Sequence, residues 1–322
     1  MNEASSKYVD QIATEKLILE KLSLVHHTPG SNGLAFDINL NGVDQQPVQS
    51  AGLVERLNGM SGEITFPSAI QTEYAENNLV RCKYWFSGAP QRDLIFVHGL
   101  YEDNLEIYRS LISLLNEQGI NVYLLILPYH YGRKPQASLF SGEYFWSGNI
   151  QRSVQAYLQA VYDLYQLYSV VSQRSGRPVW IAGFSMGGGV LLTLATKAAL
   201  QGIFAINPVC NLIQLVWTSA LFAGIRRDLE ESGWTFDKAK AAFSGFEPLC
   251  ADPLQAGEEK VILACSLYDQ INDPGNYDLL IHKWGLKNIL KYKAGHLNVL
   301  RVPRLAADIA QFCMESRQNE LL

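Results

Sequence analysis

Short apolar runs alternate with longer helical segments through most of this chain, and this alternation constrains the fold more than any other feature. The apolar runs contain no charged residue, which is typical of strands buried on both faces. They lie at 94–97, 122–127, 179–182, 203–209 and 261–267. Helical segments follow them at 107–115, 149–173, 190–200 and 303–314. Such alternation forms right-handed crossovers, so we expect an α/β fold with a mostly parallel sheet and helices on both faces.

One region interrupts the alternation. Residues 211–260 are helical and contain aromatic residues, so we predict a helical cap inserted into a core of residues 63–210 and 261–322. Within the core, strand-like runs at 64–66 and 79–86 have no helix between them. Consecutive strands of this kind predict an antiparallel edge of the sheet.

Residues 1–62 are predicted to form an N-terminal extension, partly helical and partly irregular. The pattern of an amphipathic helix covers residues 8–24, and Pro29-Gly30 follows it. A stretch rich in glycine and asparagine continues from there. The apolar residues of the helical segment are Val9, Ile12, Leu17 and Leu24.

The composition excludes several classes of protein. Among the 322 residues, 48% are hydrophobic and 18% are charged, which rules out a disordered or fibrous chain. The net charge of −5 argues against a nucleic-acid partner. No apolar run reaches the ~18 residues of a membrane span, and we find no secretion signal. Because the five cysteines are scattered and odd in number, we expect reduced thiols and a cytoplasmic protein.

A candidate nucleophile lies in Gly183-Phe184-Ser185-Met186-Gly187, which has the form G-x-S-x-G. The spacing alone is a weak signal, but it follows an apolar strand and precedes a helical segment. That context predicts a sharp turn that lifts the Ser185 hydroxyl out of the sheet. The adjacent helix N-terminus would stabilise developing negative charge. The alternative is a glycine-rich turn that only holds a helix close to the sheet.

Together with three further features, this turn makes the chain resemble the α/β-hydrolase superfamily over about residues 63–316. The features are His98-Gly99 after a buried strand, Asp269 after a later strand and His296 near the C-terminal end. The resemblance implies an α/β-hydrolase fold and a catalytic triad in the chain order Ser185, Asp269, His296.

The resemblance also implies an oxyanion hole, formed in this superfamily by backbone N–H groups. In this chain the donors would be the N–H groups of Leu100 and Met186. For the His98 side chain we favour packing against a neighbouring loop, with a place in the substrate pocket as the alternative.

The base and its carboxylate partner are expected in late loops. An attacking serine needs a base within hydrogen-bond reach, and His296 follows a late strand with a glycine before it. The alternative for His296 is an exposed loop histidine. Asp269 best fits the place after the strand at 261–267. Asp273 is a rival that could instead cap the next helix, and Asp252 is a more distant one.

Two further regions are predicted to line a substrate pocket. An aromatic loop after the strand at 122–127 contains His130 and Arg133, at the strand end where open α/β sheets bind ligands. The alternative is a packed loop. Trp217 lies in an apolar segment of the expected cap, which could cover an acyl pocket, touch a membrane surface or simply form core between cap and sheet.

The sequence therefore predicts a serine hydrolase that cleaves a carboxylic ester or thioester of a small-molecule substrate through an acyl-enzyme on Ser185. The alternatives are acyl transfer by the same residues and a catalytically silent protein that binds a ligand or partner. No motif indicates a metal, a nucleotide or another cofactor. The acyl group, the leaving group and the oligomeric state are not indicated by the sequence.

Overall fold

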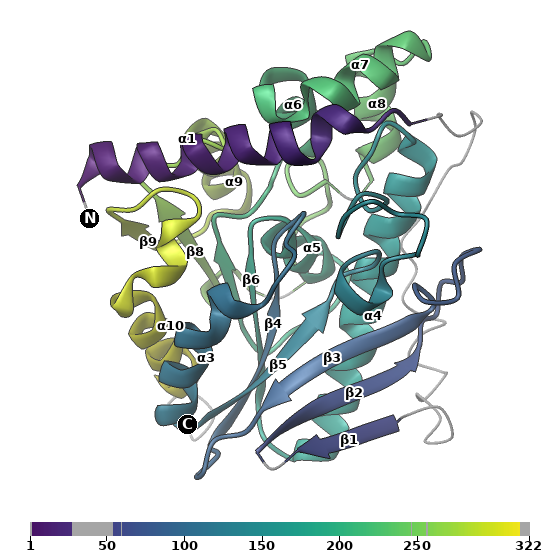
Figure 1. Ribbon diagram of the computed structural model, residues 1–322. Coiled ribbons are helices and arrows are strands. Elements are labelled where there is room, and N and C mark those ends of the chain that lie inside the picture. Colours follow the sequence, from purple (N-terminus) through teal and green to yellow (C-terminus); the bar gives the residue numbers. More distant parts are fainter. Residues whose placement is uncertain (1, 28–53, 59, 246, 256, 316–322) are drawn as a thin grey trace.

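The predicted apolar runs form the centre of a nine-stranded sheet in the computed structural model, with the strand order β1-β2-β3-β5-β4-β6-β7-β8-β9 (Figure 1). The structure describes residues 2–27, 54–58, 60–245, 247–255 and 257–315, so most of the predicted irregular stretch lies outside it. The strands are β1 Val54–Asn58, β2 Ser61–Pro67, β3 Leu79–Trp85, β4 Arg92–Val97, β5 Ile120–Ile126, β6 Val179–Phe184, β7 Ile203–Ile206, β8 Val261–Ser266 and β9 Asn288–Tyr292.

The pairing of the strands confirms the predicted α/β fold. All pairings among β4 to β9 are parallel, whereas β1, β2 and β3 pair antiparallel and join the rest through β5. Every side chain of β4, β5, β6 and β8 is buried, as a sheet covered on both faces requires. The antiparallel edge is confirmed, and β1 is an additional edge strand that the sequence pattern does not indicate.

Helices cover both faces of this sheet. On one face α3 (Glu106–Glu117) and α10 (Pro303–Glu315) share an apolar core, and on the other α4 (Ile150–Ser175), α5 (Met186–Ala195) and α9 (Pro274–Trp284) share a second one. None of the helices in the described part of the chain is long and apolar enough to cross a membrane.

Three helices lie between β7 and β8, where the sequence predicts a cap. They are α6 (Leu212–Thr218), α7 (Ala223–Glu231) and α8 (Phe236–Phe243), and they lie above the carboxyl edge of the sheet near α1 in Figure 1. Most of the apolar residues of α6 are buried, so this helix packs onto the molecule beneath it. The exact boundaries of extension, core and cap stay predictions.

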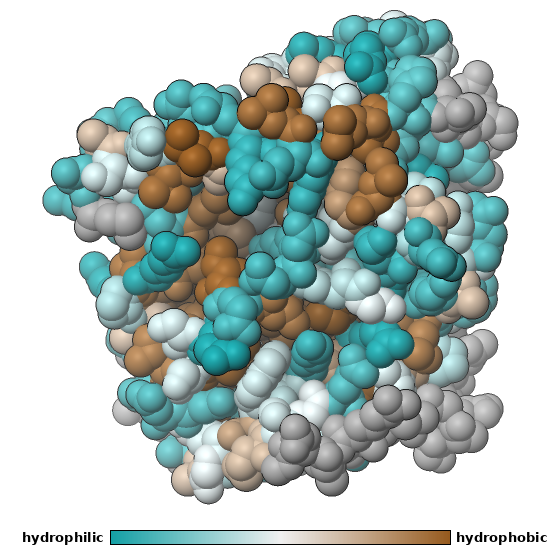
Figure 2. Space-filling view, viewed as in Figure 1, coloured by the Kyte–Doolittle hydropathy of each residue, from teal (hydrophilic) through white to brown (hydrophobic). Residues whose placement is uncertain are grey.

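The N-terminal helix α1 (Glu3–Glu20) lies across the same edge, but with an unexpected face inward. An amphipathic helix normally buries its apolar side. Here Val9 and Ile12 are 37% and 43% exposed, and Figure 2 shows apolar residues at the surface along this helix. The fully buried side chains are those of Ser6 and Asp10. Polar contacts, described below, decide how this helix lies.

A buried ion pair joins the loop after β5 to α4. The Arg133 guanidinium lies 2.8 Å from Oδ2 of Asp163, and both side chains are fully buried. Arg133 also donates to the carbonyl oxygens of Asn77 at 2.7 Å and Ile126 at 2.9 Å. Oδ1 of Asp163 accepts a hydrogen bond of 2.6 Å from Ser68. These contacts offset part of the desolvation of the two charges, and burial still raises the pKa of Asp163 and lowers that of Arg133.

Removing one partner of this pair should destabilise the protein strongly. Arg133→Met leaves the Asp163 carboxylate buried without its counter-charge, so we expect the free energy of unfolding in urea to fall by about 3–5 kcal/mol. Arg133→Met combined with Asp163→Leu should be more stable than Arg133→Met alone. Equal stability of the single and double variants would contradict this account.

Candidate active site

Ser185 lies in the turn between β6 and α5, at the carboxyl edge of the sheet. Its φ of 53° and ψ of −115° are strained for a residue with a side chain. Gly187 allows this turn, because a Cβ atom there would lie 2.3 Å from the carbonyl oxygen of Val97 at the end of β4. The start of α5 thus touches β4, and the hydroxyl of Ser185 is held at the edge of the sheet.

Two late loops bring an imidazole and a carboxylate to this hydroxyl. Nε2 of His296 lies 2.9 Å from Oγ of Ser185, and Nδ1 of His296 lies 2.8 Å from Oδ2 of Asp269. All three side chains are buried. The structure therefore brings together the three residues that the sequence analysis named as a triad, although 111 residues separate Ser185 from His296.

The loop after β8 orients the Asp269 carboxylate. Its Oδ1 accepts hydrogen bonds from the backbone N–H groups of Ile271 at 2.8 Å and Asn272 at 2.9 Å, which leaves Oδ2 facing His296. The two rival acids have other contacts. Asp273 caps α9 by accepting from Gly275, and Asp252 pairs with Lys197.

The contacts of His296 determine which of its ring nitrogens carries the proton. A carboxylate only accepts hydrogen bonds, so Nδ1–H donates to Asp269 and Nε2 can accept a proton from Ser185. Burial on its own lowers the pKa of His296. The nearby carboxylates of Asp269, Asp10 and Glu102 outweigh burial, and the pKa is raised above its ordinary value of 6.5.

A cavity of about 190 Å³, called here the serine cavity, opens beside Ser185 and His296. Leu100 and Met186, the predicted oxyanion-hole residues, both line it. Neither of their backbone N–H groups donates a hydrogen bond to a residue that the structure describes. The other walls of the serine cavity are mainly apolar and include Leu17, Phe184, Val209, Leu215, Leu221 and Phe222. The cavity thus offers two backbone donors and an apolar lining.

Glu102 also lines the serine cavity and was not found from the sequence. Its Oε1 accepts from the N–H of Gly99 at 3.1 Å and from the hydroxyl of Tyr108 at 2.6 Å. Burial raises the pKa of Glu102 to about 7, although these hydrogen bonds oppose the shift. A second group in the site therefore titrates near neutral pH. The sequence signal that could have indicated Glu102 is its position in the turn after β4, three residues beyond Gly99.

Asp10 of α1 is the second residue that sequence reasoning missed. Its Oδ2 accepts hydrogen bonds from the backbone N–H groups of His296 at 2.6 Å and Gln270 at 3.3 Å. Its Oδ1 accepts from the backbone N–H of Leu297 at 3.1 Å. Burial raises the pKa of Asp10, and the bonds from His296 and Leu297 oppose that shift. One carboxylate thus holds both loops that carry Asp269 and His296. No local pattern around Asp10 distinguishes it from a surface aspartate.

The structure does not bring His98 and His130 into the serine cavity. Both side chains are fully buried. Nε2 of His98 accepts from the N–H of Leu127 at 3.0 Å, and Nε2 of His130 accepts from the N–H of Tyr101 at 3.2 Å. Burial lowers the pKa of both imidazoles, to about 4 for His98. They hold neighbouring loops together as neutral side chains.

Arg133 and Trp217 also lie away from the serine cavity. Arg133 is enclosed with Asp163, so its charge is compensated inside the fold and does not face a substrate. Trp217 is partly buried against the core, and its ring packs edge-on against Phe236 at a centroid distance of 5.9 Å. Neither residue lines the serine cavity, and each packs where its own loop or helix meets the core.

Within the described residues, one group of side chains has the spacing of metal ligands. His26, Asp228 and Glu231 have ligand atoms within 4.8 Å of one another. The Arg227 guanidinium already lies 2.6 Å from Oδ1 of Asp228, the buried member of the group. This positive charge opposes a cation at the same oxygen, so the donor set fits an ion pair better than a metal.

The sheet topology and the strand–Ser185–helix turn define an α/β hydrolase. A family model described as the alpha/beta hydrolase family matches residues 94–287, more than half of the chain, and the protein belongs to this family. A search of curated protein sequences finds no match.

Solved structures with a similar fold include two acetyl xylan esterases. Acetyl xylan esterase 1 from Thermoanaerobacterium sp. JW/SL YS485 is 16% identical, with a TM-score of 0.60, over 82% of this chain and 86% of that one. The acetyl xylan esterase from Paenibacillus sp. R4 is 14% identical, with a TM-score of 0.61, over 92% of this chain and 98% of that one. At these identities the likeness establishes the fold alone.

The contact of Asp10 with the His296 loop makes an electrostatic prediction. Asp10→Asn removes a negative charge near the imidazole, so the pKa of His296 should fall, measured by NMR titration of its ring. Asp237→Asn, which changes a carboxylate in the first turn of α8, is the matched control and should leave that pKa unchanged. An unchanged or higher pKa of His296 in Asp10→Asn would refute the electrostatic role.

Proposed function

We propose that this protein is a serine hydrolase that cleaves a carboxylic ester or thioester through an acyl-enzyme on Ser185. The observation that carries the proposal is the pair of contacts made by His296, 2.9 Å to Ser185 and 2.8 Å to Asp269. One nitrogen of the ring is held by a carboxylate, and the other faces a hydroxyl in a strained turn. This arrangement suits a base that activates a nucleophile.

In the first half of the reaction, Oγ of Ser185 attacks the carbonyl carbon of the substrate and its proton passes to Nε2 of His296. The negative charge then develops on the carbonyl oxygen. The backbone N–H groups of Leu100 and Met186 are available to stabilise this oxyanion, and such donors typically contribute ~3 kcal/mol each. Asp269 stabilises the imidazolium that forms.

In the second half, Nε2–H of His296 protonates the leaving oxygen or sulfur, and the bond between it and the carbonyl carbon breaks. Water then attacks the acyl group on Ser185 and gives a proton to His296. The tetrahedral intermediate collapses, the carboxylic acid leaves, and His296 returns the proton to Oγ. The apolar walls of the serine cavity suit an acyl chain, and the two esterases of similar fold support an ester substrate.

The nucleophile can be tested directly. Ser185→Ala should lower kcat for p-nitrophenyl acetate by at least about 1,000-fold and abolish labelling by a fluorophosphonate probe, because it removes the hydroxyl on which the proposed acyl-enzyme forms. Ser113→Ala, a change on the exposed side of α3, is the matched control and should keep the activity of the parent protein. Parent-like hydrolysis by Ser185→Ala would reject the proposal.

The pH dependence of kcat/KM gives a second test. His296 must be neutral to accept the proton of Ser185, and its pKa is raised above 6.5. Activity should therefore be full above this pKa and should fall as the pH is lowered through a midpoint higher than 6.5. A midpoint at or below that value would contradict the assignment.

Because Glu102 has a pKa of about 7, it could produce a similar midpoint. Glu102→Gln removes that titration. If His296 is the base, the loss of activity on acidification should remain in this variant and shift to lower pH, since one of the carboxylates that raise the pKa of His296 is gone. Disappearance of the acidic limb would assign it to Glu102 instead.

A further inference from the structure

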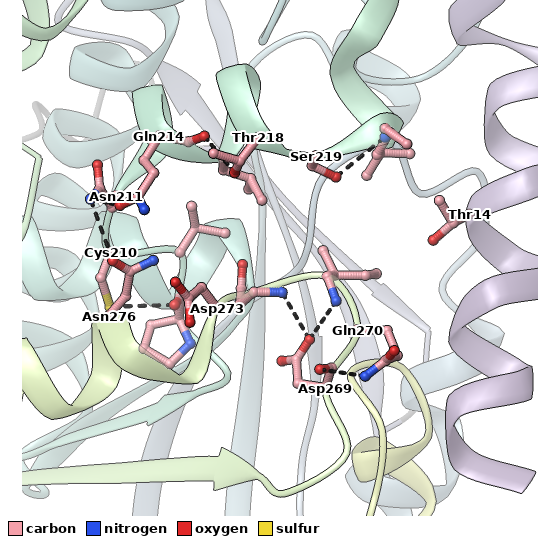
Figure 3. A pocket seen from close by; sticks show the side chains of 17 residues that line it. Thr14, Cys210, Asn211, Gln214, Thr218, Ser219, Asp269, Gln270, Asp273 and Asn276 are labelled. Carbon is pink, nitrogen blue, oxygen red and sulfur yellow. Dashed lines mark hydrogen bonds between the residues drawn. The ribbon is translucent and has the colours of Figure 1, made fainter. Parts of the chain in front are cut away.

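A second cavity adjoins the serine cavity on the side of the Asp269 loop (Figure 3). It has a volume of about 400 Å³, and we call it the amide-lined cavity after Asn211, Gln214 and Asn276, which stand in its wall. The two cavities lie next to each other, because they share five lining residues: Thr14, Val209, Leu215, Leu221 and Ile271.

The position of this cavity indicates which part of a substrate it receives. The oxyanion donors, Leu100 and Met186, line the serine cavity and are absent from the lining of the amide-lined cavity. Residues 269–273, from the loop after β8 whose Asp269 contacts His296, line the amide-lined cavity, and Ser185 and His296 line the adjacent serine cavity. His296 has to protonate the leaving atom in the reaction proposed above. A group that extends toward this loop is therefore the leaving group, and the acyl chain lies in the serine cavity.

Charge narrows the chemistry of that leaving group. Of the 17 described residues that line the amide-lined cavity, none is lysine, arginine or histidine, whereas Asp269 and Asp273 are carboxylates. Phosphate and carboxylate groups are normally bound by cationic side chains. An anionic leaving group, such as the phosphate-bearing thiol coenzyme A, would meet no compensating charge in this lining.

A chain of hydrogen bonds sets the direction of the amides. The ammonium of Lys240 can only donate, and it lies 2.9 Å from Oδ1 of Asn211. The NH₂ group of Asn211 consequently faces the other way and donates to Oε1 of Gln214 and to Oδ1 of Asn276. The NH₂ groups of Gln214 and Asn276 donate to none of the residues that the structure describes, so both are available to a ligand.

The amide-lined cavity therefore presents hydrogen-bond donors without positive charge. Figure 3 shows Asn211, Gln214 and Asn276 grouped at one end of the cavity, and Thr14 at the other. Amide NH₂ groups can donate to uncharged hydroxyl oxygens, and the hydroxyl of Thr14 can both donate and accept. A molecule with several hydroxyl groups matches this lining, whereas an alkyl alcohol would leave the amide groups desolvated and unpaired.

We propose that the amide-lined cavity binds the alcohol part of the substrate, and that this alcohol is a neutral polyhydroxylated molecule, either a polyol or a sugar. The inference rests on the proposed hydrolase function and specifies its substrate class. Gln214 and Asn276 are the residues that select the alcohol, through their NH₂ groups.

The test compares esters that share one acyl group and differ in the alcohol. With the purified full-length protein, kcat/KM is measured for butanoyl glycerol, methyl 6-O-butanoyl glucoside, hexyl butanoate and butanoyl coenzyme A. We expect at least one of the two hydroxyl-rich esters to exceed both other substrates by about tenfold or more, and the faster one identifies polyol or sugar. Higher efficiency with hexyl butanoate or the coenzyme A thioester would overturn the proposal.

Variants test the two amides separately from the nucleophile. Gln214→Glu replaces the donor by an acceptor of equal size, and Asn276→Leu removes it. Each should lower the ratio of kcat/KM for the preferred hydroxyl-rich ester to kcat/KM for hexyl butanoate by about tenfold, the effect of one lost hydrogen bond, because the hexyl group offers the amides no acceptor. Equal losses with both substrates would overturn the role of the amides.

A control and a separate outcome complete the design. Gln118→Leu changes an exposed glutamine at the end of α3, where the chain enters β5 at the opposite edge of the sheet, and should alter neither activity. If Ser185→Ala abolishes hydrolysis but the parent shows no preference for hydroxyl-rich esters, the hydrolase proposal stands and this inference alone is rejected.

Discussion

The close contact between Gly187 and the end of β4 is the constraint on which the rest of the site depends. Because no side chain separates them, the turn after β6 lies directly against the turn after β4. Ser185 is forced into its strained conformation, and the backbone N–H of Met186 comes to line the same cavity as that of Leu100. The positions of the proposed nucleophile and of the proposed oxyanion donors therefore follow from one steric fit, set by a residue without a side chain.

The loops opposite this contact depend on polar bonds. Exposed loops are usually the most mobile parts of a fold. Here the buried carboxylate of Asp10 joins the loop after β8 to the loop after β9, through the N–H groups of Gln270, His296 and Leu297. This explains why α1 lies with a polar face inward and leaves apolar residues in solvent. The N-terminal helix is part of the architecture of the site.

The two adjacent cavities differ in a way that matches the two halves of the proposed ester substrate. Apolar walls surround Ser185 on the side of the oxyanion donors, and amide groups line the side from which a leaving group would depart. In the proposed reaction His296 lies between the hydroxyl of Ser185 and the leaving group, so the change from apolar to polar lining would occur near the scissile bond. The geometry thus connects the chemistry of the site with the chemistry of its substrate.

Local signals in the sequence were sufficient to predict the α/β fold and the sharp turn that holds Ser185. Apolar periodicity and the sterics of a glycine-rich turn act over a few neighbouring residues, so they can be recognised without coordinates. The partners of buried polar groups cannot be recognised from the sequence in this way. Arg133 pairs with Asp163 of a distant helix, and Asp10 contacts a loop 286 positions further along the chain. Such pairings are decided by which loops meet in the folded chain, because a buried charge or N–H group must find its partner wherever the tertiary structure places one.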